Sequence, residues 1–143
     1  MRGVNPEARL VRIENITRGT VLGDRVRIAS SSADRTVGLL RTPELHEGEG
    51  LWIERSPSIH MFFMPYAIDA VFVSAAGRVT KIAAGLRPWR VVWWARGARD
   101  CLELPAGAAA RANTQVGDEL RVVDVDEAEA DVAPQTSRAT EKP

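Results

Sequence analysis

The sequence has few of the residues that build disulfide frameworks and metal sites. It contains one cysteine, Cys101, and two histidines, His46 and His60, in a chain of 143 residues. A single cysteine cannot form an intrachain disulfide. Neither a C-x-x-C nor an H-E-x-x-H spacing occurs, and no glycine-rich loop has Walker or dinucleotide spacing. We therefore expect no disulfide framework, no metal site and no cofactor.

Long apolar runs and an excess of one charge are also missing. No stretch approaches the ~20 apolar residues of a membrane helix, and residues 1–15 lack the apolar core of a secretory signal. The 19 basic and 19 acidic residues give a formal net charge of zero. Total charge thus favours neither nucleic acid nor an anionic membrane. We expect a cytoplasmic, soluble protein whose partner is a small molecule or another protein.

Composition divides the chain into a body and a tail. Residues 126–143 (DEAEADVAPQTSRATEKP) hold five acids and two basic residues, and Val132 is their one large aliphatic residue. Such a segment buries too little apolar area to offset the entropy of ordering it. The sequence predicts a single β domain over residues 9–125 and a disordered acidic tail over residues 126–143.

Short strand signals dominate the body. They combine apolar alternation with β-branched and aromatic residues, and they fall at residues 10–13, 26–28, 51–53, 68–73, 79–82, 101–104 and 120–125. The turn at residues 75–77 predicts a hairpin between the fourth and fifth of these strands. Short helices are predicted at residues 33–40 and 106–112. The pattern predicts a mainly β fold, a small antiparallel sandwich or barrel-like domain.

The aromatic residues gather in one part of the chain. All eight lie between Trp52 and Trp94, which is typical of a core-forming region. Trp93 and Trp94 are different, because neighbouring residues on a strand face opposite ways. One of the two should face outward or line a groove.

Three ionisable residues stand out by their surroundings. His60 is one of them, because a histidine can act as base, acid or ligand. Asp69 opens an apolar strand and Glu103 lies within another, so each carboxylate needs a partner or solvent. Candidate partners with the bidentate guanidinium are Arg35, Arg41, Arg87 and Arg90. The alternative for all three residues is a structural role. The histidine would then be hydrogen-bonded within the fold, and the two carboxylates would form ion pairs at the sheet edge.

Four stretches together resemble the domain-of-unknown-function 192 family. They are residues 35–53, 58–73, 77–90 and 101–120. The Gly38-Leu39-Leu40-Arg41 segment resembles the family's G-L-M-x-R element, with Leu40 where Met is usual. Leu102 to Gly107 matches L-E-L-P-A-G, and Ile68-Asp69 matches the Asp that leads an apolar strand. Ile59, His60 and Met64 resemble the family's I-H-T-x-x-M form, with Met61 in place of Thr. The resemblance implies a compact β fold and no particular activity.

The leading hypothesis is a non-catalytic domain that binds a small polar ligand or a peptide in a groove. The residues expected to line it are Arg41, His60, Asp69, Arg87, Trp93, Trp94 and Glu103. One alternative is a hydrolase-like enzyme in which His60 is the base and Asp69 orients it. Another is an accessory protein that docks on a larger assembly through a sheet edge or the exposed Trp.

Overall fold

The fold was taken from a computed structural model, which describes residues 9–30, 44–61, 64–92 and 95–125. The predicted helix at residues 33–40 and the predicted tail at residues 126–143 lie outside these ranges. The described elements are β1 (Leu10–Asn15), β2 (Thr20–Ala29), β3 (Glu49–Ile53), β4 (Ile59–His60), β5 (Ile68–Val73), β6 (Val79–Leu86), β7 (Val91–Val92), β8 (Asp100–Pro105), α2 (Ala108–Arg111) and β9 (Leu120–Asp124).

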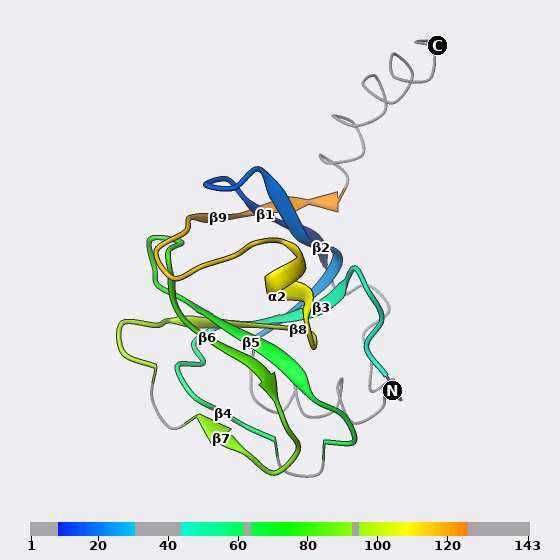
Figure 1. Ribbon diagram of the computed structural model, residues 1–143. Coiled ribbons are helices and arrows are strands. Elements are labelled where there is room, and N and C mark those ends of the chain that lie inside the picture. Colours follow the sequence, from blue (N-terminus) through cyan, green and yellow to red (C-terminus); the bar gives the residue numbers. More distant parts are fainter. Residues whose placement is uncertain (1–8, 31–43, 62–63, 93–94, 126–143) are drawn as a thin grey trace.

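The prediction of a mainly β fold is confirmed (Figure 1). Seven strands form one sheet in the order β6-β5-β8-β3-β2-β1-β9, and β4 pairs with β7 in a separate ribbon. The sequence predicts an antiparallel fold, but β2 and β3 are parallel. The long connection over residues 30–48 explains the difference, because a parallel pair needs a crossover rather than a hairpin. The predicted hairpin of β5 and β6 is present.

The sheet curls until its two edge strands meet at one corner (Figure 1). A bridge joins Arg78, just before β6, to Glu119, just before β9. The Val79 N–H donates to the Asp118 carbonyl at 2.8 Å, and the Leu120 N–H donates to the Gly77 carbonyl at 2.8 Å. Backbone hydrogen bonds therefore close the half-barrel at this corner.

A buried polar cluster fixes the same corner. The Asp118 carboxylate is 2% exposed and accepts hydrogen bonds from the Asn15 amide (3.0 Å), the Arg18 Nε (3.0 Å) and the Gln115 N–H (2.9 Å). The Asn15 amide also donates to Thr114 Oγ1 at 3.2 Å. The hydrogen bond from Arg18 is the largest influence that lowers the pKa of Asp118 from 3.8 to about 2. We name these residues the Asp118 cluster.

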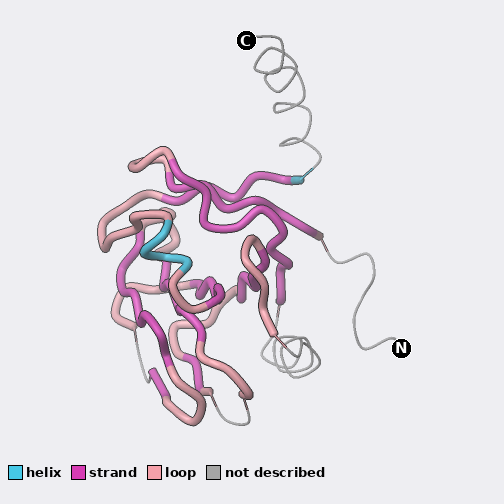
Figure 2. Tube along the Cα trace, turned by 45° about the vertical axis from the view of Figure 1, so that its right-hand side comes forward, coloured by secondary structure: helices cyan, strands magenta, loops and turns pink. Residues whose placement is uncertain are grey.

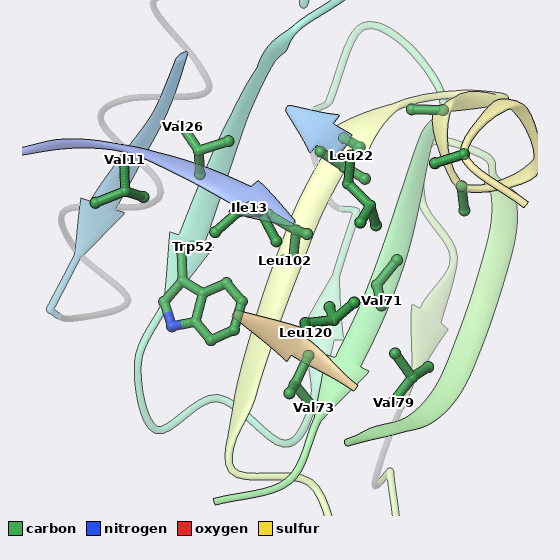
Figure 3. Close-up of a cluster of buried hydrophobic side chains, with 14 residues drawn as sticks. Val11, Ile13, Leu22, Val26, Trp52, Val71, Val73, Val79, Leu102 and Leu120 are labelled. Carbon is green, nitrogen blue, oxygen red and sulfur yellow. The ribbon is translucent and has the colours of Figure 1, made fainter. Parts of the chain in front are cut away.

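Apolar side chains cover both faces of the sheet. The inner core fills the concave face and includes Val71, Trp52 and the alanines at and next to α2, with Trp52 on the far side of the cluster from the helix (Figure 3). Figure 2 shows α2 within the curl of the strands. A second, outer cluster includes Phe72 and Met61 and packs β4 against the convex face. This is why all six residues of β5 are buried, and full burial of a side chain such as Phe72 stabilises the fold by about 1.5–3 kcal/mol.

Helix α2 is shorter than the predicted helix over residues 106–112. Gly107 precedes it with a φ of 95°, and Asn113 follows its last turn with a φ of 55°. Backbone in this left-handed region ends a helix, and glycine adopts it without strain. In the part of the chain that the structure describes, no helix is long and apolar enough to cross a membrane.

Candidate functional site

Asp69 points toward the inner core, where backbone donors surround it. It pairs with Leu104 of β8 and is 1% exposed. Its Oδ1 accepts from the Gly85 N–H at 2.8 Å, and its Oδ2 accepts from the N–H groups of Gly107 (3.1 Å) and Ala109 (3.0 Å). The carboxylate thereby ties β6 and the start of α2 to β5. These hydrogen bonds give Asp69 a structural role.

Glu103 points to the other side of the sheet. Its partners in the register are Ala70 of β5 and Leu51 of β3, which both belong to the outer cluster. Glu103 and Asp69 sit on neighbouring strands but one residue out of register, and successive side chains alternate between faces. The structure therefore separates Asp69 from Glu103, whereas the predicted groove contains both.

His60 lies in the small ribbon of β4 and β7, and Arg87 directly follows β6. Neither residue is among the donors to the Asp69 carboxylate. Ile59 is buried in the outer cluster, and the next residue, His60, is exposed. Arg87 is also exposed. Because both Asp69 oxygens bind backbone N–H groups, the geometry gives no support to a His60–Asp69 catalytic pair. Arg41, Trp93 and Trp94 lie outside the described residues, so their place in a site stays a prediction.

The convex face carries a pocket of about 370 Å³ with apolar and charged side chains in its lining, which we name the Arg27 pocket. Its described lining residues are Leu10, Arg25, Arg27, Leu45, Glu49 and Gly50. The parallel register pairs Arg25 with Glu49 and Arg27 with Leu51. Alternation then places Arg25, Arg27 and Glu49 on the face that Leu51 and Glu103 share. The pocket thus sets two guanidinium groups beside a carboxylate.

Tyr66 is not among the lining residues of the Arg27 pocket, but charged residues of the pocket influence its ionisation. Burial is the main cause that raises the pKa of Tyr66 above its usual value of 10.0, and the negative charges of Glu103 and Glu49 raise it further. The positive charge of Arg27 acts in the opposite direction. These influences place Tyr66 within electrostatic range of Glu103, Glu49 and Arg27.

Two groups in this region have hydrogen-bonding capacity that the described protein does not use. The Tyr66 hydroxyl is shielded from solvent, and no hydrogen-bond partner for it occurs among the described residues. The half-buried Arg27 makes no ion pair with any described carboxylate, although Glu49 lines the same pocket. Glu49 is held by the His46 N–H, which donates to its Oε1 at 2.9 Å. A phenol, a guanidinium and a carboxylate can together bind a ligand that carries both charges.

Sequence reasoning found Glu103 but missed Arg27, Glu49 and Tyr66. Arg27 lies inside the strand signal at residues 26–28, and Glu49 lies just before the strand signal at residues 51–53. A signal was available for Tyr66, because it is the only tyrosine in the chain and lies inside the aromatic region. Nothing in the sequence shows that a parallel pair sets Arg25 and Arg27 beside Glu49.

The fold and the pocket define a small, mainly β domain with a partly charged pocket on its convex face. A comparison with protein families assigns the domain to a family. The family model of DUF192, described as "Uncharacterized ACR", matches residues 13–122. The chain belongs to this family, as its resemblance to the family predicts.

The chain is similar to UPF0127 proteins of archaea and to two solved bacterial structures. It is 34% identical over 110 residues to a UPF0127 protein of Thermococcus sibiricus, covering 74% of this chain and 71% of the relative. The identity to a UPF0127 protein of Pyrococcus furiosus is 32% over 109 residues, covering 74% and 93% of the two chains.

Both structural neighbours share the fold. A protein of unknown function from Novosphingobium aromaticivorans aligns with a TM-score of 0.68 at 29% identity, over 82% of this chain and 90% of that one. A putative transcription regulator from Sinorhizobium meliloti aligns with a TM-score of 0.69 at 22% identity, over 83% of this chain and 96% of that one. At 22% identity, the similarity to the Sinorhizobium meliloti protein concerns the fold alone.

Proposed function

We propose that this DUF192 domain is a non-catalytic binding domain that holds a small polar molecule in the Arg27 pocket. The observation that carries the proposal is the Tyr66 hydroxyl, which is buried and has no partner among the described residues. Leaving such a group unsatisfied costs about 1–3 kcal/mol. A ligand that exchanges a hydrogen bond with Tyr66 removes this cost in the bound state, and the cost becomes part of the binding energy.

The charges of the pocket indicate the class of ligand. Arg25 and Arg27 suit a carboxylate, because the guanidinium matches its two oxygens. Glu49 suits an ammonium group. The Arg25 Nη2 donates to the Glu47 carbonyl at 2.9 Å, which uses one of the five N–H donors of that guanidinium. Arg27 makes no ion pair with a described carboxylate, so we expect it to be the main cation for a ligand. A zwitterion of amino-acid size fits this pattern, and the cavity lies within the usual range of small-molecule sites.

A binding role is favoured over catalysis by the surroundings of the ionisable residues. The hydrolase-like alternative requires a base that a third group orients, and the Asp69 carboxylate is engaged by the N–H groups of Gly85, Gly107 and Ala109. Cys101 is fully buried within β8, and a buried thiol is usually inert.

The single tyrosine allows a direct test in the full-length protein. Glycine and glutamate serve as zwitterionic probes, and acetate and methylamine as probes with one charge. We expect the zwitterions to shift the ring resonances of Tyr66 and to change the pH at which its tyrosinate absorbance appears. Acetate and methylamine should bind at least about tenfold more weakly, because each engages one side of the pocket.

Variants separate a pocket effect from a general ionic effect. R27Q removes the expected main cation and should abolish the shift. R121Q is the matched control, because Arg121 is an exposed arginine on β9 that pairs with Glu14 at 2.7 Å, outside the pocket. A zwitterion response that survives in R27Q, or a complete lack of response to all four probes in the wild type, would overturn the proposal.

A further inference from the structure

Charge is distributed unevenly along the chain despite its zero sum. Residues 55–99 hold one acid, Asp69, whereas the other 18 acids of the protein lie outside this range. Asp69 is buried within the fold. The range contains seven basic residues, and all of them are exposed: Arg55, Arg78, Lys81, Arg87, Arg90, Arg96 and Arg99. Four of them, Arg78, Lys81, Arg87 and Arg90, lie between the start of β4 and the end of β7, and no described residue of this span is an exposed acid. We name the exposed part of this span the positive surface.

Trp89 stands out within this surface. Its side chain is 58% exposed, and it belongs to neither buried cluster. The backbone around it is anchored to the end of β4, since the Trp89 N–H donates to the Met61 carbonyl at 2.7 Å and the Met61 N–H donates to the Arg90 carbonyl at 2.7 Å. An exposed indole is thus held in a fixed turn between Arg87 and Arg90.

The backbone at Trp89 adopts a conformation that bulky side chains avoid. Its φ is 72°, and the left-handed region costs a non-glycine residue about 1–2 kcal/mol. Glycine would occupy the position without that cost. A tryptophan that is strained and largely exposed is a candidate for recognition rather than for core packing.

His60 borders the same turn. It pairs with Val91 across the β4–β7 ribbon, two residues beyond Trp89, and its side chain is exposed. His60, Arg87, Trp89 and Arg90 form what we name the Trp89 surface. It combines the residue types that dominate protein-binding hot spots, tryptophan and arginine, with a histidine that becomes cationic in acid.

We propose that the Trp89 surface docks an acidic peptide segment of a partner protein, with an apolar or aromatic residue of the segment against the Trp89 indole. The positive surface would steer the acidic segment and fix its position. This proposal does not depend on the Arg27 pocket, which lies on other strands.

A peptide fits the observations better than a nucleic acid. Outside residues 55–99 the chain carries 18 acids against 12 basic residues. A long polyanion would meet this excess negative charge, and a short acidic segment would not.

Fluorescence anisotropy on the full-length protein tests the proposal. The probe is a short fluorescein-labelled peptide in which one Phe is flanked by glutamates, and the same peptide with lysines is the negative control. W89G should weaken binding of the glutamate peptide by about tenfold or more. The double variant R87Q/R90Q should weaken it to a similar extent, and its effect should shrink as salt is raised.

Two further variants control for surface chemistry in general. V116A shortens another exposed apolar side chain, which is 62% exposed, and R121Q removes an arginine outside the Trp89 surface. Both should bind the peptide as the wild type does. W89G should melt no lower than the wild type, because glycine relieves the strained φ; if it fails to fold, R87Q/R90Q carries the test.

Several results would overturn the proposal. One is equal binding of the glutamate and lysine peptides by the wild type. A second is unchanged peptide binding by both folded Trp89-surface variants. A third is that an oligothymidylate strand or phosphatidylserine vesicles bind in a Trp89-dependent manner while the glutamate peptide does not, since this would assign the surface to a nucleic acid or a membrane.

Discussion

Two polar regions of this protein contain similar side chains but differ in how completely they are hydrogen-bonded. In the Asp118 cluster, the carboxylate of Asp118 and the amide of Asn15 are bonded to Arg18, Thr114 and each other. In the Arg27 pocket and its neighbourhood, the buried Tyr66 hydroxyl has no bond to any described group.

The difference separates a structural role from a binding role. Buried polar groups that serve the fold are usually satisfied within it, so a buried group that is not satisfied needs another explanation. The Asp118 cluster holds the corner where β6 meets β9, and its hydrogen bonds account for its burial. Among the described residues, the fold provides no hydrogen-bond partner for the Tyr66 hydroxyl. We therefore propose that the region around Tyr66 binds a ligand.

Asp69 belongs with the structural groups and should give the largest effect when changed. D69N replaces a carboxylate oxygen with an NH2 group that cannot accept from Gly85, Gly107 or Ala109. We expect the free energy of unfolding to fall by about 3 kcal/mol, because at least one buried backbone donor loses its acceptor. Urea denaturation measures the loss.

The matched control for this change is D124N. Asp124 pairs with Arg9 at 3.1 Å, but both side chains are largely exposed, so the loss should stay below about 1 kcal/mol. Equal losses in D69N and D124N would show that the backbone hydrogen bonds of Asp69 contribute little.

The Asp118 cluster should make stability depend on pH in the acid range. The pKa of the Asp118 carboxyl group is about 2 in the folded protein, whereas its ordinary value is 3.8. The folded value is the lower one, so the carboxylate stabilises the fold above pH 4, and this contribution is lost as the pH falls from about 4 toward 2.

R18Q removes the largest cause of the lowered pKa and should flatten this part of the stability curve. Thermal melts between pH 5 and pH 2 measure this effect. As the pH falls, the melting temperature should decrease less in R18Q than in the wild type, and the two decreases should differ by about 5 °C near the middle of this pH range. Parallel curves for the two proteins would contradict the assignment to Arg18.

Tyr66 should give the smallest effect on stability, and of the opposite sign. Y66F removes a buried hydroxyl that has no described partner, so the unfolding free energy should stay the same or rise by up to about 1 kcal/mol. The same variant should bind the zwitterionic probes more weakly than the wild type. A clear loss of stability would mean that the hydroxyl is bonded within the folded protein, and the contrast with Asp118 would disappear.

Much of the fold follows from local sequence pattern. β5 matches its predicted range of 68–73 because five of its six residues are apolar and most of these are β-branched or aromatic. β8 and β9 differ from their predicted ranges by one residue at one or both ends. The two-residue strands β4 and β7 were not predicted. Strands this short carry no periodicity, and only tertiary packing creates them.

The candidate site was harder to predict than the fold. Asp69 and Glu103 drew attention correctly as carboxylates in apolar strands, but their side chains face opposite ways because the register offsets them by one residue. Register depends on pairing between distant strands, which local pattern does not encode. The Arg27 pocket depends on the parallel pairing of β2 with β3, so its charges are far apart in the sequence.

The pairing of β1 with β9 constrains how this protein can be made and engineered. Val11 lies opposite Asp124, so β9 must return to β1, which is made more than 100 residues earlier, before the described sheet is complete. Early translation products cannot acquire the native topology, and a chain truncated within β9 should be degraded rather than partly active. The same adjacency brings the two ends of the domain together, so a short linker could join them and new termini could be opened at an exposed loop.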